Sequence, residues 1–208
     1  MPPQMNQLIN RLETALRQRP PRLDLTSHSS RPASVFMPLC WHNDEVHMLF
    51  TKRTSQLYHH SGQISFPGGS QEQNDPDPAY AAMRETFEEI GVPFANMRII
   101  LRLDQQSTFT GFLITPFLGV IHPARDFKLN YNEVERLIMV PLFKVLNLNN
   151  YQEEEIIWQD TPAYWMALKH EGDIIWGATA RILLTFIAAL HEVGLNHEIA
   201  MDSRGQRV

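Results

Sequence analysis

The sequence predicts an α+β domain, a fold class in which helices and strands are mixed along the chain. Two segments, one near each end, have the apolar spacing of helices, and a third, acid-rich helical segment lies between them. Short apolar runs bounded by turn residues separate these segments and are typical of strands. With 208 residues and a hydrophobic fraction of 43%, the chain can bury one substantial core, so we expect one domain.

The first helix is expected over residues 4–17, ended by Pro20 and Pro21. Its apolar side chains recur at helical spacing, namely Leu8, Ile9, Leu12, Ala15 and Leu16. Such a helix can cap its own domain or contact a partner chain, and capping is the commoner outcome. A polar, proline-flanked linker follows. We therefore divide the chain into a helix and linker over residues 1–32, a main domain over 33–195 and a polar tail over 196–208.

Strands are expected on both sides of the acid-rich segment. Two of them, residues 33–41 and 45–53, are joined by a turn at residues 42–44. Later strands are expected at residues 97–106, at 114–121, near the apolar run 137–142, and in an antiparallel pair, 156–158 with 164–169, that turns at 160–162. Residues 174–191 begin like a strand and continue as a strongly apolar helix, which we expect to pack on the sheet.

Composition limits the partners and the compartment. The formal net charge of -5 argues against broad binding of nucleic acid or anionic membranes. The only cysteine, Cys40, excludes an intramolecular disulfide, and its apolar surroundings predict a core residue in a protein from a reducing compartment. No segment has the apolar length of a signal peptide core or a membrane span. We expect a cytoplasmic protein, either a monomer or a homodimer.

The acid-rich helix begins after Asp77, a suitable N-cap, with Pro78 in its first turn, and Gly91 ends it. Its expected apolar stripe consists of Tyr80, Met83, Phe87 and Ile90. On a helical wheel, three glutamates fall together on the side away from that stripe: Glu85, Glu88 and Glu89. The helix therefore presents a cluster of carboxylates on one face.

Three neighbouring carboxylates in the last turns of a helix repel one another and oppose the helix dipole. Arg84 can pair with Glu88 one turn later, but one guanidinium does not balance three carboxylates. Mg²⁺ or Mn²⁺, which prefer oxygen ligands, are the natural addition, and a phosphate-bearing substrate would follow from such a metal. The alternative is a solvated acidic helix face, which is common in proteins.

The residues around these carboxylates resemble the Nudix box of the Nudix hydrolases. Gly68-Gly69 leads, Arg84-Glu85 and Glu88-Glu89 follow at fixed offsets, and Gly91-Val92 closes the pattern. The sequence departs from the pattern in three ways: Asp75 replaces a glutamate, one extra residue separates it from Arg84, and Thr86 stands at an aliphatic position. The resemblance implies the Nudix fold, an α/β/α sandwich with a mixed β-sheet.

The resemblance also implies roles for the residues of this stretch. Glu85, Glu88 and Glu89 would bind Mg²⁺ or Mn²⁺, and Arg84 would pair with Asp75. A further carboxylate that acts on the metal or the attacking water would come from the acidic pair Glu133 and Glu135, with Glu133 favoured. A solvated turn explains that pair about equally well. Glu89 or Glu133 would orient or deprotonate the water.

The segment before the box resembles a signature of the coenzyme A pyrophosphatase branch. The agreement covers residues 49–53, Leu57, His60, Gly62, Gln63 and residues 66–69, whereas Tyr58 stands where the branch has arginine. Ser107, with Thr110 and Gly111, resembles a hydroxyl-rich turn of the same branch, although a plain hairpin turn explains it nearly as well. The implied substrate-binding residues are Arg53, His60, Gln63, Gly68, Gly69 and Ser107.

The implied reaction is hydrolysis of the diphosphate of coenzyme A or its thioesters, which gives 3′,5′-ADP and a 4′-phosphopantetheine product. The partner is then a small, nucleotide-type molecule. Two alternatives remain open: a Nudix pyrophosphatase for a nucleoside triphosphate or another nucleoside diphosphate derivative, and a binding module that keeps the Nudix fold without turnover. The altered loop around Asp75 suggests the second, and the intact glutamates argue against it.

Overall fold

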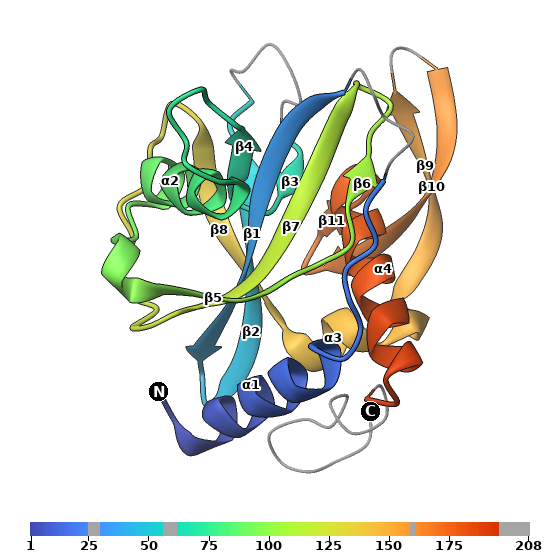
Figure 1. The fold of residues 1–208 in the computed structure, drawn as a ribbon. Coiled ribbons are helices and arrows are strands. Elements are labelled where there is room, and N and C mark those ends of the chain that lie inside the picture. The colour runs from blue at the N-terminus through green and yellow to red at the C-terminus, as the bar shows by residue number, and fades with distance from the viewer. Residues whose placement is uncertain (25–29, 56–61, 159–160, 196–208) are drawn as a thin grey trace.

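The computed structural model describes residues 1–24, 30–55, 62–158 and 161–195, arranged as in Figure 1. In these residues, a main sheet of eight strands and a separate sheet of three strands are surrounded by helices. The main sheet contains β1 (Arg31–His42), β2 (Glu45–Arg53), β3 (Ile64–Ser65), β4 (Gly68–Ser70), β5 (Met97–Arg102), β6 (Gln106–Ser107), β7 (Phe112–Ile121) and β8 (Val134–Pro141). The second sheet contains β9 (Tyr151–Trp158), β10 (Thr161–His170) and β11 (Asp173–Ile175). The helices are α1 (Pro3–Leu16), α2 (Pro78–Ile90), α3 (Leu142–Leu146) and α4 (Gly177–Glu192), with 3₁₀ turns η1 (Phe94–Asn96) and η2 (Leu148–Asn150).

The main sheet is mixed because β1 pairs with its two long neighbours in opposite directions. It is antiparallel to β2, through a tight turn in which Asn43 and Asp44 both have positive φ, and parallel to β7. The strand order is β3-β2-β1-β7-β5, with β4 on β1, β6 on β7 and β8 on β2. The expected hairpin is confirmed, and β1 begins earlier than expected, at Arg31.

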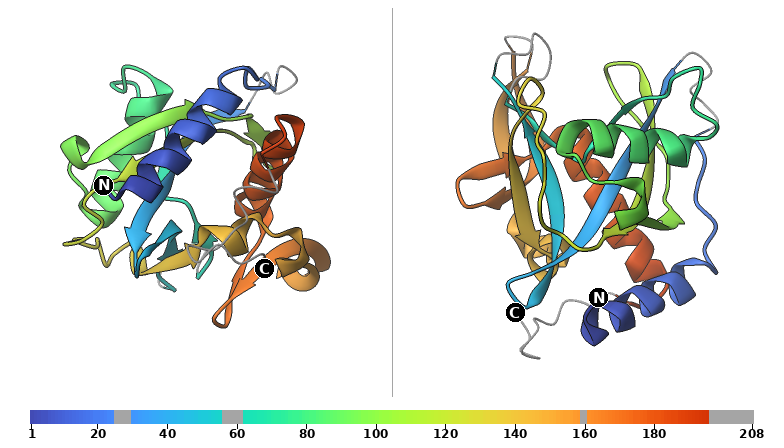
Figure 2. Two further views of the ribbon diagram at one scale, coloured as in Figure 1. Left: turned by 90° about the horizontal axis from the view of Figure 1, so that it is seen from below. Right: turned by 90° about the vertical axis from the view of Figure 1, so that its left-hand side faces the viewer.

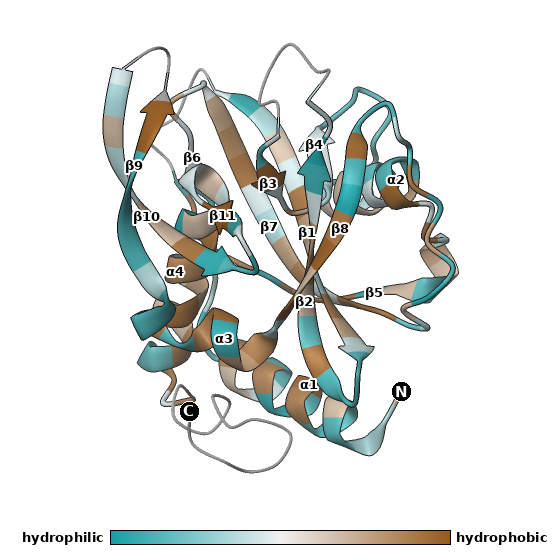
Figure 3. Cartoon of the chain, turned by 180° about the vertical axis from the view of Figure 1, so that it is seen from behind, coloured by the Kyte–Doolittle hydropathy of each residue, from teal (hydrophilic) through white to brown (hydrophobic). Residues whose placement is uncertain are grey.

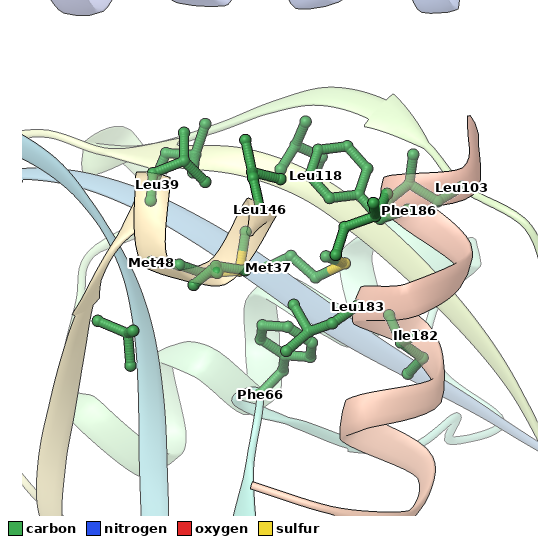
Figure 4. Close-up of a cluster of buried hydrophobic side chains, with 14 of the residues drawn as sticks. Met37, Leu39, Met48, Phe66, Leu103, Leu118, Leu146, Ile182, Leu183 and Phe186 are labelled. Atoms are coloured by element: carbon green, nitrogen blue, oxygen red, sulfur yellow. The ribbon is translucent and has the colours of Figure 1, made fainter. Parts of the chain in front are cut away.

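Both faces of the main sheet are covered by helices, which explains why its strands are continuous apolar runs rather than alternating ones. In β1, Phe36 and Cys40 face the core beneath α2, whereas Met37 and Leu39 face the larger core beneath α1, α3 and α4. Figure 4 shows this larger core, where Met37 meets Phe186 and Leu183 of α4. Burial raises the pKa of the Cys40 thiol to about 12, as expected of a core residue.

A glycine in β7 makes the core beneath α2 possible. A Cβ atom on Gly119 would lie 2.2 Å from the ring of Phe36 and 2.7 Å from the backbone oxygen of Arg98. The Phe36 ring therefore occupies the space that a side chain at residue 119 would need.

Helix α1 caps the larger core, as expected. Met5, Ile9, Leu12 and Leu16 are buried on its inner face, and each contributes roughly 1.5–3 kcal/mol by its burial. The helix lies across the lower end of the sheet (Figure 2), and hydrophilic and hydrophobic residues alternate along it (Figure 3). The helix thus belongs to the packed domain, and among the described residues no helix is long and apolar enough to cross a membrane.

Helix α2 begins and ends where the sequence predicts, but the expected buried face is only partly confirmed. The Asp77 side chain accepts a hydrogen bond from the Tyr80 N–H at 2.8 Å, and Gly91 has the left-handed conformation of a C-cap. Tyr80 and Phe87 are 41% and 49% exposed and pack on Phe94. Ile90 of the predicted stripe is buried and Met83 is partly buried against the core. The other buried side chains are Ala81, Ala82, Thr86 and Glu89.

The reason for this difference is the short distance between α2 and the strands beneath it. Small side chains allow α2 to lie close against β1 and β4, where the large rings of the predicted stripe would not fit. Thr86 fits this contact because its hydroxyl donates to the Ala82 carbonyl at 2.7 Å, which satisfies its polar group inside the core.

Two strand predictions need correction. The strand expected over residues 97–106 is interrupted, because β5 ends at Arg102 and Asp104 turns inward to pair with Arg19 before β6 begins. The second sheet is longer than expected, with β9 paired to β10 from Tyr151 with Leu168 to Trp158 with Thr161. Pro162, expected in the turn, lies in β10, and Asp160 and the tail over residues 196–208 lie outside the described residues.

Candidate active site

Arg84 organises the acidic helix and the loop before it. Its Nε and Nη2 donate to Oδ1 and Oδ2 of Asp75, both at 2.9 Å, and Nη2 also donates to the Ser70 carbonyl at 3.1 Å. The Glu72 N–H donates to Asp75 at 2.7 Å. Hydrogen bonds from Arg84 lower the pKa of the Asp75 carboxyl. The expected pairing is therefore present, and aspartate with one extra loop residue reaches Arg84 in a bidentate geometry.

Two of the predicted metal ligands share the remaining nitrogen of Arg84. Its Nη1 lies 3.0 Å from Glu85 Oε1 and 3.0 Å from Glu88 Oε2. Glu88 is exposed, whereas Glu85 is half-buried, and burial raises the pKa of the Glu85 carboxyl against the opposing effect of Arg84. Arg84 therefore supplies part of the positive charge that this cluster needs.

Glu89 is the buried member of the cluster, with 2% of its surface exposed. Burial raises its pKa to about 8, although the nearby guanidinium of Arg53 acts in the opposite direction. Arg53 Nη1 lies 4.0 Å from Glu89 Oε1, which is too long for a hydrogen bond. In the described part of the chain, Glu89 Oε2 and Arg53 Nε are buried and make no hydrogen bond. A buried carboxylate with an unused oxygen is costly unless something else binds it.

Two glycines bring the backbone of β4 against this cluster. A Cβ atom on Gly69 would lie 2.6 Å from the carboxyl carbon of Glu85, so only glycine leaves room for that carboxylate. Gly68 has φ of +153°, and its Cβ would lie 2.4 Å from the Ser34 carbonyl of β1. The glycine pair thus fixes the distance between α2 and the sheet.

The predicted fourth carboxylate, Glu133, lies close enough that its charge raises the pKa of both Glu85 and Glu89. The Asn130 amide donates to Glu133 Oε1 at 3.0 Å. By contrast, Glu135 is exposed and lies 4.0 Å from Arg136 Nε. The geometry therefore favours Glu133 over Glu135 as the member of this cluster.

The donors present suit a divalent metal ion. Carboxylate oxygens are the ligands that Mg²⁺ and Mn²⁺ prefer, and the unused Glu89 oxygen is one such ligand. Within the described ranges, however, no three His, Cys, Asp or Glu side chains are gathered as a coordination shell. Glu85 and Glu88 are instead held by Arg84. The chemistry fits, and the role of Glu85, Glu88 and Glu89 as metal ligands stays a prediction.

A cavity of about 380 Å³ opens beside the glycine pair. Its inner end is lined by Arg53, Gln63, Gly68 and Gly69, which are four of the six predicted substrate-binding residues. Ser107 lies next to the lining: its hydroxyl donates to Asp24, and its carbonyl accepts from Arg181 at 3.2 Å. His60 and Tyr58 lie outside the described residues.

The outer end of the cavity contains residues that the sequence interpretation missed. They are Phe109 from the loop before β7, Trp165 of β10, and Trp176 and Arg181 at the start of α4. One signal was available, because Arg181 is a single arginine in the otherwise apolar segment 174–190. A second signal was Trp176-Gly177 with Thr179-Ala180, which resembles the start of the carboxy-terminal helix of the coenzyme A pyrophosphatases. Trp165 gave no signal, since an aromatic residue in a strand is ordinarily a core residue.

A protein-family model described as the NUDIX domain matches residues 31–170. The chain belongs to the Nudix family. The match runs from the first residue of β1 to the last residue of β10. The predicted Nudix fold, with a mixed sheet and helices on both faces, is therefore confirmed.

Two NudL proteins support the same family. A protein named "Uncharacterized Nudix hydrolase NudL" from Photorhabdus laumondii is 29% identical over 183 residues, which cover 86% of this chain and 94% of the relative. The NudL protein of Escherichia coli K12 is 30% identical over 164 residues, or 78% of this chain and 84% of the relative. Among solved structures, the Nudix hydrolase RenU from M. smegmatis covers 54% of this chain and 71% of its own, with 17% identity and a TM-score of 0.46. The family match and the NudL relatives support pyrophosphohydrolase chemistry in general.

Proposed function

We propose that this Nudix protein hydrolyses the diphosphate of coenzyme A or its thioesters. The observation that carries the proposal is the cavity that joins the glycine pair and Arg53 to an aromatic outer end. A diphosphate above the carboxylates of α2 would have one of its organic groups inside this cavity, whose volume of about 380 Å³ is in the range of small-molecule sites. Coenzyme A carries a large organic group on each side of its diphosphate, and one of them would lie in this cavity.

The agreement between the upstream segment and the coenzyme A pyrophosphatase signature adds independent support. Arg53 and Gln63 belong to that segment and line the cavity, and the Gln63 carbonyl accepts from the Arg53 N–H at 2.9 Å. Residues of the signature are thus part of the cavity wall at the end nearest the carboxylates.

In the proposed reaction, water attacks one phosphorus atom of the diphosphate and the bond from that phosphorus to the bridging oxygen breaks. The products are 3′,5′-ADP and the 4′-phosphopantetheine half, and the proton of the water passes to a carboxylate. Glu85, Glu88 and Glu89 would hold Mg²⁺ or Mn²⁺, which when bound lowers the pKa of water and neutralises phosphoryl charge.

The protein's own residues have distinct parts in this reaction. The glycine pair allows the backbone to approach the diphosphate, and Arg53 supplies a cation beside Glu89. Glu89 or Glu133 orients or deprotonates the water. Arg84 positions Glu85 and Glu88 and holds the loop through Asp75.

The test is chromatography of coenzyme A after incubation with the protein and Mg²⁺ or Mn²⁺. Glu89→Gln is compared with Glu135→Gln, a matched change at an exposed glutamate outside the cluster. Release of 3′,5′-ADP by the wild type and by Glu135→Gln, but not by Glu89→Gln, supports the proposal. Cleavage of another nucleoside diphosphate derivative with intact coenzyme A would refute the substrate, and binding without any cleavage would favour a non-catalytic module.

A further inference from the structure

We propose that the outer end of the cavity binds the adenine ring of the substrate, and that Arg181 binds the phosphate on its ribose. This inference rests on the proposed function for the identity of the substrate, but it gives residues a ligand-binding role that the sequence resemblance does not. Phe109, Trp165 and Trp176 form the aromatic wall. Arg181 also lines the cavity, and it is held near this wall by its hydrogen bond to the carbonyl of Ser107, two residues before Phe109.

The aromatic wall is a chain of ring contacts that leaves a ring surface open. Phe109 and Trp165 meet edge to face with centroids 5.7 Å apart, and Trp165 and Trp176 are tilted at 5.7 Å. Phe109 is nevertheless 81% exposed, the largest exposed fraction among the large hydrophobic side chains of the described residues. A phenylalanine that lines a cavity and leaves most of its ring in water is suited to stack on a planar ligand.

Trp165 is the central ring of this wall, because it contacts both Phe109 and Trp176. Its indole nitrogen is buried, and the described residues offer it no hydrogen-bond partner. Ring packing rather than hydrogen bonding therefore positions this side chain. A rigid aromatic wall is favourable for stacking because little side-chain entropy is lost when a base binds.

Arg181 supplies an available positive charge. Its Nη1 donates to the Ser107 carbonyl at 3.2 Å and its Nη2 to the Gln106 side-chain oxygen at 3.5 Å. Both partners are uncharged, and in the part of the chain that the structure describes no carboxylate pairs with Arg181. An arginine held at a cavity by neutral acceptors keeps its charge for an anion, and its fork matches a phosphate.

These two features favour the nucleotide half of the substrate over the pantetheine half. A purine offers a flat π surface to the aromatic wall, and the ribose phosphate of coenzyme A offers the anion for Arg181. The pantetheine arm is flexible, has no aromatic ring, and carries no charge beyond the diphosphate. Arg53 lines the inner end of the same cavity, so the diphosphate would lie between the two arginines.

The first experiment measures selectivity for the ribose phosphate. We expect Arg181→Gln to lower kcat/KM for coenzyme A about tenfold and to leave dephospho-coenzyme A unchanged. Arg98→Gln, an exposed arginine that does not line the cavity, serves as the control and should change neither value. An equal loss for both substrates in Arg181→Gln would overturn the assignment of Arg181.

The second experiment measures stacking. We expect Phe109→Leu to raise KM for coenzyme A about tenfold with kcat unchanged. Tyr164→Leu is the matched control, because Tyr164 is a similarly exposed aromatic residue, 66% exposed, and does not line the cavity. Equal effects of the two changes would overturn the aromatic wall.

A binding measurement separates this inference from the proposed reaction. Without metal, 3′,5′-ADP should quench the fluorescence of the wild type, and Phe109→Leu, which keeps every tryptophan, should bind it about tenfold more weakly. That result would support the inference even if coenzyme A were not hydrolysed. Quenching of the fluorescence by 4′-phosphopantetheine but not by 3′,5′-ADP would place the pantetheine half of the substrate against the aromatic wall and would refute the inference.

Discussion

Two arginine–aspartate pairs in this molecule have nearly the same geometry and serve different regions. Arg84 binds both oxygens of Asp75 at 2.9 Å, and Arg19 binds both oxygens of Asp104 at 2.8 Å. The two arginine side chains are equally covered, each with 13% exposed. The first pair holds a loop against the acidic helix, whereas the second joins segments that are distant in the sequence.

The difference lies in what surrounds each pair. Nη1 of Arg84 is shared with two more carboxylates, Glu85 and Glu88, so its charge supports the candidate active site. Arg19 also pairs with Glu192 at the end of α4, so its charge ties the segment after α1 to the connection between β5 and β6 and to α4. The same ion-pair chemistry therefore lies in the candidate active site at one place and joins distant segments of the fold at the other.

The largest effect should come from breaking the structural pair. Arg19→Met leaves Asp104, which is 6% exposed, without its main cation, and we expect the free energy of unfolding to fall by about 3 kcal/mol. The activity of the folded protein should change little. Urea unfolding measures the loss, with Arg17→Met as the control, because Arg17 is 69% exposed and its ion pair contributes little. Equal losses in the two variants would contradict this prediction.

The corresponding change at the candidate active site should lower activity much more than stability. Arg84→Met removes the cation that Glu85 and Glu88 share, so we expect kcat/KM for the accepted substrate to fall about 100-fold. We expect the free energy of unfolding to fall by only about 1 kcal/mol, because the loop residues on both sides of Asp75, 72–74 and 76–77, are exposed, so that a small shift would hydrate the carboxylate. Steady-state kinetics and urea unfolding of Arg84→Met and Arg19→Met, compared side by side, test this. A variant that keeps full activity would show that Glu85 and Glu88 need no positioning by Arg84.

A smaller change tests the position of Glu85 alone. In Gly69→Ala the new Cβ would displace the carboxylate of Glu85, which is the end of a flexible side chain. We therefore expect about a tenfold loss of kcat/KM and little loss of stability. Gly172→Ala is the control, because Gly172 has φ of +87° with no atom within 4 Å of a Cβ. Gly172→Ala should cost about 1 kcal/mol of stability and no activity. Loss of activity in Gly172→Ala but not in Gly69→Ala would rule out a role for the contact between Gly69 and Glu85.

The smallest effect is the pH dependence of the structural pair. Burial acts to raise the pKa of the Asp104 carboxyl, but hydrogen bonds from Arg19 and Arg22 outweigh it, and the net pKa is lowered. The stabilisation is therefore complete at pH values above the unfolded-state pKa of Asp104, about 4, and is lost as the pH falls through its lower folded-state pKa. We expect the stability difference between the wild type and Asp104→Asn to shrink by about 1 kcal/mol between about pH 6 and about pH 3. A difference that does not change with pH would count against the charged pair.

Local features of the fold could be predicted from the sequence. The caps of α2, Asp77 and Gly91, and the pairing of Arg84 with Asp75 all lie within one short stretch, where spacing and turn chemistry are sufficient. The buried face of α2 could not be predicted in this way. Hydrophobicity favoured Tyr80 and Phe87, but the close approach of β4 selects small side chains.

Features built from distant segments were out of reach of sequence reasoning. The aromatic wall combines Phe109, Trp165 and Trp176 from three segments, and the pair Arg19–Asp104 joins residues 85 positions apart. Neither has a local pattern, because the contacts exist only after the sheet is complete. The cluster around Glu89 is intermediate: its glutamates were identified, but the burial of Glu89 depends on the unexpected orientation of α2.

The parallel pairing of β1 with β7 sets the order in which the strands can pair while the chain is being synthesised on the ribosome. The hairpin of β1 and β2 can form early, because its strands are adjacent in the chain. The other edge of β1 must wait until residues 112–121 have been synthesised, and until then it exposes apolar side chains and unpaired backbone groups. A nascent chain stopped before β7 should therefore bind chaperones more strongly than one in which residues 112–121 have been made.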